Sequence, residues 1–246
     1  MPTPLPRSVA LVSTLLAAGS ALAQTCEVRS GPKPPAVVEL YTSEGCSSCP
    51  PADHWLSTLK TQDPVLALSF HVNYWNHLGW RDPFATPETT ARQYRLKDAL
   101  RGKYVYTPQV VLNGRDHRDW HGQRASSLAG LPAATAPALR LSRQGDVVTA
   151  QIAAATGTEP RTELAGYWAV LQDGLVSKVT RGENAGENLR HDHVVSLYQP
   201  VPPWAAAQGG SARLTLPAGA TQRVAFVVTN AGLTQPLQAL VLQCPT

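Results

Sequence analysis

The stretch AVVELYTSEGCSSCPPAD, residues 36–53, decides the fold expected for the first half of the chain. Residues 36–41 are a β-rich apolar run with few breaks, typical of a short buried strand. Residues 50–60 indicate a helix, because a proline stands in the first turn, an aspartate follows early and a lysine comes late. Cys46 and Cys49 therefore lie between the end of a strand and the start of a helix.

The rest of the first half continues this alternation of strand and helix patterns. Further strands are predicted over residues 65–72 and 109–112, and further helices over residues 87–101 and 123–131. Strands that alternate with helices favour an α/β layer fold.

From Pro137 onward the sequence becomes β-rich. Residues 139–155 and 164–179 each indicate a hairpin, the second with its turn at Asp173-Gly174. Residues 214–230 and 237–243 supply further strands, and several short strands with regular turns predict a small sandwich. The alanine- and proline-rich residues 131–138 are the natural linker, so we expect two domains, 24–134 and 135–246.

The first 23 residues have the features of a secretory signal peptide. Arg7 supplies the positive charge, residues 9–16 are mostly apolar, and Ala21-Leu22-Ala23 forms a cleavage site. We expect a soluble mature chain that begins at Gln24, is exported to the periplasm or secreted, and keeps no membrane segment after cleavage.

Composition and charge exclude several function classes. The 246 residues carry a formal net charge of +4, and basic residues gather only at Arg92, Arg95, Lys97, Arg101 and Lys103. This run is too sparse for a nucleic-acid surface and predicts a solvated helix face instead. The sequence has no glycine-rich phosphate loop and no nucleophile elbow.

The four cysteines fall into two groups. In an oxidising compartment an even number of cysteines predicts disulfides, so Cys26 and Cys244 are expected to form a structural bridge that ties the chain ends. The chain-entropy model gives such a long loop about 4–5 kcal/mol. Free or separately engaged thiols are the alternative.

Cys46 and Cys49 form a motif whose meaning depends on the helix that follows. A cysteine at a helix N-terminus faces unpaired N–H groups, which favour its thiolate. We expect Cys46 to attack a partner disulfide and Cys49 to resolve the mixed disulfide. The nearby charge of Glu44 should oppose the thiolate and weaken this activation.

Three other functions could use the same two cysteines. Half of a zinc site is one, but no second CxxC is present. Copper(I) bound by the thiolates and a histidine, such as His71 or His77, is another. A static disulfide is the third. The strand–CxxC–helix context favours redox chemistry over these alternatives.

A proline far downstream strengthens the redox interpretation. Thr107-Pro108 immediately precedes the strand predicted at residues 109–112, about sixty residues after the CxxC. The arrangement resembles the cis-proline strand of thioredoxin-like proteins, in which the X-Pro peptide lies beside the dithiol. From the sequence alone, a trans proline at the start of a strand is the default, whereas the resemblance implies a cis peptide with Pro108 positioning a partner strand. Exchange would also require a Cys46 sulfur that is partly exposed beside this peptide.

Longer blocks of the sequence resemble one exported thioredoxin-like family, known as domain of unknown function 1223. The first block is residues 37–53, the second HVNYWNHLGWRDPF at residues 71–84, the third Thr107-Pro108-Gln109, and the last runs from Arg181 to Val195. The match covers nearly the whole mature chain. It implies the fold and the dithiol but no particular reaction.

A few further residues have two interpretations each. By resemblance Glu39 would be a buried base for Cys49, although an exposed edge position is equally open. The aromatic residues 70–84 predict core packing more than a wall of the site. His191 and His193 would share one face of a strand, but a surface loop is favoured over a metal site.

Together these observations predict an α/β thioredoxin-like domain followed by a β-rich sandwich-like domain. The expected function is thiol–disulfide exchange on exported protein thiols or disulfides, with catalytic residues Cys46, Cys49, Thr107, Pro108 and Glu39. No cofactor, resident metal, nucleic acid or membrane partner is expected. The alternative is a non-catalytic binding module that holds copper(I) or a static disulfide. The motif does not distinguish an oxidase from a reductase or an isomerase.

Overall fold

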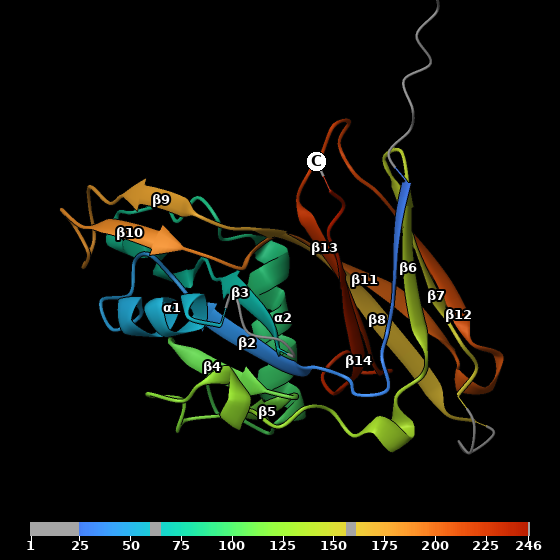
Figure 1. The fold of residues 1–246 in the computed structure, drawn as a ribbon. Coiled ribbons are helices and arrows are strands. Elements are labelled where there is room, and N and C mark those ends of the chain that lie inside the picture. Colours follow the sequence, from blue (N-terminus) through green and yellow to red (C-terminus); the bar gives the residue numbers. More distant parts are fainter. Residues whose placement is uncertain (1–24, 60–64, 156–160, 246) are drawn as a thin grey trace, which may run out of the picture.

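The computed structural model describes residues 25–59, 65–155 and 161–245. Its strands are β1 (Thr25–Arg29), β2 (Ala36–Thr42), β3 (Val65–His71), β4 (Gln109–Leu112), β5 (Arg115–Asp116), β6 (Leu139–Gln144), β7 (Val147–Ile152), β8 (Glu163–Gln172), β9 (Leu175–Lys178), β10 (Asn188–His191), β11 (Val194–Ala205), β12 (Gly210–Thr215), β13 (Arg223–Asn230) and β14 (Pro236–Leu242). They form an eight-stranded sheet in the order β14-β13-β8-β11-β3-β2-β4-β5, a four-stranded sheet in the order β1-β6-β7-β12, and a ribbon of β9 and β10 (Figure 1).

Two α-helices are present among the described residues, α1 (Pro50–Ser57) and α2 (Pro87–Ala99). Both have a proline in the first turn, where its missing N–H costs nothing. A capping box fixes the start of α2, since the Thr86 hydroxyl accepts from the Thr89 backbone and the Thr89 hydroxyl accepts from the Thr86 backbone. Short 3-10 turns lie at Tyr74–Leu78, Ala125–Ser127, Ala133–Thr135 and Ala206–Gln208.

The predicted fold class, a thioredoxin-like α/β domain followed by a sandwich-like domain, is wrong. The protein is mainly β-sheet, and its largest sheet contains strands from both halves of the chain. β11, from the second half, pairs in parallel with β3 at Val194 and Ser69, and antiparallel with β8. The open edge of β3 is thus covered by a strand from the second half, which removes an unpaired edge and joins the two halves.

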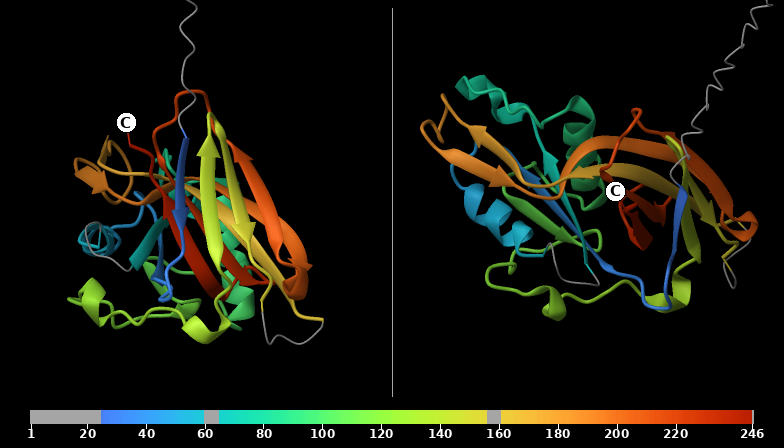
Figure 2. Two further views of the ribbon diagram at one scale, coloured as in Figure 1. Left: turned by 45° about the vertical axis from the view of Figure 1, so that its right-hand side comes forward. Right: turned by 45° about the horizontal axis from the view of Figure 1, so that its top comes forward.

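Three apolar cores follow from this arrangement (Figure 2). One lies on the side of the large sheet that faces α2, a second between the large and the four-stranded sheets, and a third between β2 and α1. β8 contributes side chains to both the first and the second core, because successive side chains point to opposite faces of a strand. Tyr167 lies in the first core and Trp168 in the second, and both side chains are fully buried.

Other predicted elements have mixed outcomes. The hairpin over residues 139–155 is confirmed as β6 and β7. The hairpin over residues 164–179 is wrong, because β8 pairs with β11 and β13 whereas β9 pairs with β10. In place of a helix over residues 123–131 there is only the short turn Ala125–Ser127. Arg92 does not belong to a solvated face, since it is 2% exposed.

The bridge between Cys26 and Cys244 is confirmed, with their Cα atoms 5.7 Å apart. It joins β1, an edge strand of the four-stranded sheet, to the segment after β14, an edge strand of the large sheet. Two disulfides in one chain are typical of an oxidising compartment. The predicted signal peptide, residues 1–23, lies outside the described residues, among which no helix has the length and apolarity needed to cross a membrane.

Candidate functional site

The Cys46–Cys49 disulfide lies at the start of α1, and its formation in the structure confirms the predicted pairing. β2 ends at Thr42, and the chain then turns tightly, with Cys46 N donating to the Ser43 carbonyl and Cys49 N to the Cys46 carbonyl. Cys49 is the N-cap of α1. The first turn of α1 offers no free N–H group to the Cys46 sulfur, because its first two residues are prolines and the N–H groups beside them donate to the Cys46 and Cys49 carbonyls. Only the positive end of the helix dipole is left to favour a Cys46 thiolate once the bridge is reduced.

Pro108 lies near this loop. The Thr107–Pro108 peptide is cis, as predicted. Tyr41 pairs with Gln109 between β2 and β4, so the peptide sits at the end of β2 from which the cysteine loop departs. A pocket of about 330 Å³ separates α1 from this peptide, and Ser48, Pro51 and Pro108 are among its lining residues.

Trp75 connects the cysteine loop with the proline loop. Its indole Nε1 donates to the Thr107 hydroxyl at 2.8 Å. On the other side, a Cβ added to Gly45 would come within 2.9 Å of the Trp75 Cβ, so this position has no room for a larger residue. Part of the aromatic block thus borders the site, while Phe70 belongs to the core on the α2 side.

The expectation of a partly exposed Cys46 is wrong, because Cys46 is only 1% exposed. The segment of residues 179–187, which links β9 to β10, covers the cysteine loop. The Asn184 amide donates to the carbonyls of Glu44 at 2.9 Å and Cys46 at 3.0 Å. The Glu183 carboxylate accepts from the backbone and the hydroxyl of Ser47. We call residues 179–187 the covering loop.

Replacing Asn184 by alanine is expected to speed the reduction of Cys46–Cys49 by dithiothreitol. The change removes two hydrogen bonds that hold the covering loop, each worth about 0.5–1.5 kcal/mol, so reduction should be roughly 5- to 150-fold faster. The measurement is alkylation of the two thiols over time, followed by mass spectrometry. Glu187→Gln, an exposed change in the same loop, is the control, and equal rates in all three proteins would contradict the role of the loop.

Glu39 does not face the disulfide. It lies on the side of β2 that also carries Val37 and Tyr41 and faces the α2 core, whereas Val38 and Leu40 face α1. Its carboxylate is buried, pairs with the Arg92 guanidinium and accepts from the hydroxyls of Tyr41 and Tyr167. The structure therefore gives Glu39 a place in a core ion pair, away from the role of base for Cys49.

A second group of polar side chains lies behind the cysteine loop. We call Asp53, His71 and His191, with their partners Glu44 and Asp82, the histidine–carboxylate cluster. Asp53 comes from α1, His71 from the end of β3 and His191 from the end of β10, and α1 packs on β10. All five side chains are buried. The rings of His71 and His191 are 4.8 Å apart, and Phe84 packs edge-on against both.

The partners fix one nitrogen of each histidine. His71 Nδ1 lies 2.7 Å from Asp82 Oδ2, and His191 Nε2 lies 3.0 Å from Glu44 Oε1. Asp82 also accepts from the Glu44 backbone N–H, and Glu44 from the Trp80 indole. The buried charge of Glu44 is therefore satisfied by His191 and Trp80.

Burial and the charges of neighbouring groups shift the pKa of several members of this cluster. Burial raises the pKa of Asp53 to about 6. Burial alone would lower the pKa of His71, but the adjacent Asp82 carboxylate outweighs it and raises the value. Burial would likewise raise the pKa of Asp82, yet its contact with His71 lowers the value.

Sequence reasoning missed this cluster as a unit. It used Asp53 only as a helix-start signal and treated His71 and His191 as unrelated. One signal was available, because Asp53 lies four residues after Cys49 and so shares its face of the helix. The two histidines carried no such signal, since only the long-range packing of β3 and β10 brings them together.

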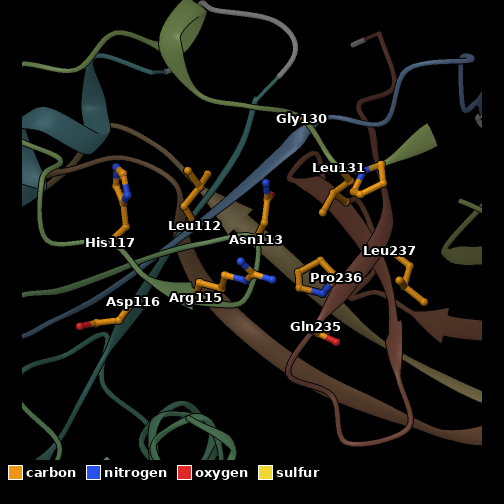
Figure 3. Close-up of a pocket in the computed structure, with 11 residues that line it drawn as sticks. Leu112, Asn113, Arg115, Asp116, His117, Gly130, Leu131, Gln235, Pro236 and Leu237 are labelled. Atoms are coloured by element: carbon orange, nitrogen blue, oxygen red, sulfur yellow. The ribbon is translucent and has the colours of Figure 1, made fainter. Parts of the chain in front are cut away.

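A larger pocket lies elsewhere. It has a volume of about 570 Å³ and is bounded by the β4–β5 turn and the β13–β14 turn (Figure 3). Asn113, Arg115, Gly130 and Pro236 are among its lining residues. It lies beyond the end of β4 opposite to Pro108, and none of the predicted site residues lines it.

Comparisons with known proteins give a family but no activity. The family described as "Protein of unknown function (DUF1223)" matches residues 37–229. A crystal structure of a protein from Agrobacterium tumefaciens is similar at 31% identity and a TM-score of 0.65, covering 85% of this chain and 93% of that one. HBP35 of Porphyromonas gingivalis is similar in fold alone, at 15% identity and a TM-score of 0.53, covering 86% of this chain and 76% of that one. No curated protein matches the chain.

Proposed function

Because this chain belongs to the DUF1223 family of proteins of unknown function, we propose an activity from its site, namely thiol–disulfide exchange with exported protein thiols or disulfides. The observation that carries the proposal is the Cys46–Cys49 disulfide at the start of α1, with the cis Thr107–Pro108 peptide at the end of β2 from which the cysteine loop departs. We also propose that the protein is exported to the periplasm or secreted, which the two disulfides support.

The exchange has two steps. In the reducing direction the Cys46 thiolate attacks a partner disulfide, and one partner sulfur leaves as a thiolate. The Cys49 thiolate then attacks the Cys46 sulfur of the mixed disulfide and releases the second partner sulfur. The partner gains two electrons and the Cys46–Cys49 pair loses two. The reverse sequence oxidises a partner dithiol, and the relative reduction potentials set the direction.

Exchange requires the covering loop to move, because Cys46 is 1% exposed when the loop is closed. The contacts that close it are few, two hydrogen bonds from Asn184 and two to Glu183. Next to the cysteine loop lies the pocket whose lining includes Ser48, Pro51 and Pro108. A partner segment could then lie along this pocket.

A static disulfide is the second candidate function, and the burial of Cys46 is the observation that favours it. A structural disulfide does not have to be reached by a partner sulfur, and burial protects it from reduction. The two candidates differ in one property, which is whether a partner sulfur can form a bond with Cys46.

A Cys49→Ser variant is expected to accumulate mixed disulfides at Cys46, because attack proceeds and resolution cannot. Insulin and oxidised glutathione serve as probes, and mass spectrometry under non-reducing conditions measures the adduct. Cys46→Ser, which keeps Cys49 as the lone thiol, is the matched control and should give about tenfold less adduct, since Cys49 is fully buried at the N-cap of α1, beneath the cysteine loop.

The same experiment can reject the proposal. If Cys49→Ser forms no adduct with either probe, even when combined with Asn184→Ala to release the covering loop, the exchange proposal fails. A static disulfide then becomes the better description of Cys46 and Cys49.

A further inference from the structure

The histidine–carboxylate cluster has an arrangement that disulfide exchange does not use. Asp53, His71 and His191 each offer one ligand atom, and these three atoms lie within 4.8 Å of one another. Nε2 of His71 and Nδ1 of His191 are buried and make no hydrogen bond. Nδ1 of His191 lies 4.0 Å from Asp53 Oδ1. Two nitrogens and one carboxylate oxygen therefore gather at one buried point.

We propose that this point is a zinc site, with Asp53, His71 and His191 as its protein ligands. Zn²⁺ binds histidine nitrogen and carboxylate oxygen at about 2.0–2.2 Å, so ligand atoms in a tetrahedral site are roughly 3.3 Å apart. The three ligand atoms lie within 4.8 Å of one another, so they need to close by about 1.5 Å at most. Three protein ligands leave one coordination position for a water molecule.

The partners of the two histidines support a cation. A histidine that binds a metal commonly donates its other ring N–H to a carboxylate, which fixes the tautomer and points the free nitrogen at the metal. Asp82 is the carboxylate next to Nδ1 of His71, and Glu44 is the carboxylate next to Nε2 of His191. Both carboxylates are themselves held, Asp82 by backbone N–H groups and Glu44 by Trp80.

Charge gives a second, independent reason. Glu44, Asp53 and Asp82 are three buried carboxyl groups, while the cluster contains only two histidines. Nε2 of His71 and Nδ1 of His191 are also buried without a hydrogen-bond partner, which costs free energy. A divalent cation offsets the excess negative charge and uses both free nitrogens, so it removes both costs at once.

The site is separate from the Cys46–Cys49 thiols. Its ligands are nitrogen and oxygen atoms only, and it forms while the disulfide is intact. The proposal therefore does not rest on disulfide exchange, and either could fail without the other. Because the ligands are buried, we expect Zn²⁺ to enter during folding and to leave slowly.

The test uses wild-type protein with both disulfides intact, unfolded and refolded with or without ZnCl₂ and then dialysed. Elemental analysis should find about one zinc per chain in the zinc-refolded sample. X-ray absorption at the zinc edge should show nitrogen and oxygen neighbours and no sulfur. Thermal unfolding should occur at a higher temperature with zinc than without, because Zn²⁺ binds the folded state.

Variants then assign the ligands. Asp53→Asn and His191→Gln should lose zinc under the same dialysis, and Asp82→Asn should weaken it by about 10- to 100-fold. His54→Gln is the matched control, because His54 is the exposed neighbour of Asp53 on α1 and should leave the zinc content unchanged. Wild-type protein refolded with ZnCl₂ that contains no zinc, or zinc bound through sulfur, would overturn the proposal whether or not the variants fold.

Discussion

Replacing Arg92 by methionine is expected to lower the free energy of unfolding by about 3–5 kcal/mol, because it leaves the Glu39 carboxylate charged and unpaired inside the core. Arg92 is 2% exposed and Glu39 is 3% exposed. The guanidinium also donates to the Tyr198 hydroxyl and to the Leu233 carbonyl, and it stacks 4.2 Å above the Tyr167 ring. One side chain thus connects α2 with β2, β8, β11 and the β13–β14 turn.

Urea unfolding followed by circular dichroism gives the required free energies. Arg95→Met is the matched control, because Arg95 is exposed on the same helix and also donates to the Tyr198 hydroxyl but has no buried carboxylate partner, so its effect should stay within about 0.5–1 kcal/mol. Adding Glu39→Gln to Arg92→Met should restore part of the loss, since the uncompensated charge is then gone. A loss below about 1 kcal/mol in Arg92→Met, or a double variant that equals the sum of its single changes, would contradict a coupled buried pair.

The ion pair between Arg92 and Glu39 could not be predicted from the sequence. A cluster of arginines and lysines on one helix is usually solvated, and nothing local marks Arg92 as different from Arg95. The difference arises because β8 and β11 place Tyr167 and Tyr198 over the first core, next to Arg92. Glu39 was assigned to the disulfide for the same reason. The sequence places Glu39 on a strand but does not show which face of that strand packs against α2 and which against α1.

Local structure could be predicted where the signals are local. The strand at residues 109–112 has the predicted limits, and α1 begins at Pro50 as expected. The two disulfides follow from the CxxC motif and the cysteine count, and the cis Thr107–Pro108 peptide was implied by the resemblance to thioredoxin-like proteins. Each of these features depends on neighbours in the sequence or on simple pairing.

Strand pairing could not be predicted, because the pattern of apolar residues identifies a strand but does not show which other strand it pairs with. The chain does leave the strand conformation at Asp173-Gly174, and Gly174 has a φ of +67°. β8 nevertheless pairs with β11 and β13 on its two sides, and β9 finds β10 instead. The covering loop and the histidine–carboxylate cluster are products of this pairing, so neither could be predicted from the sequence.

Removing the Cys26–Cys244 bridge by a double serine substitution is expected to lower the free energy of unfolding by about 5 kcal/mol on the chain-entropy model. The bridge spans 218 residues of sequence, so reduction releases a large amount of freedom in the unfolded chain. It also joins β1 and β14, each of which lies at the edge of its sheet with one strand partner. For a chain of this size the unfolding temperature should fall by roughly 10–20 °C.

The double variant Cys46→Ser with Cys49→Ser is the matched comparison, since it also replaces two cysteines and removes one disulfide. Its bridge spans only 3 residues of sequence, so the same model predicts a loss of about 2 kcal/mol. Hydrogen exchange should locate the difference, with faster exchange in β1 and β14 when Cys26 and Cys244 are replaced and faster exchange around α1 in the other variant. If the two variants lose equal stability, or if β1 and β14 stay protected without their bridge, the disulfide does not hold the two sheets together at this edge.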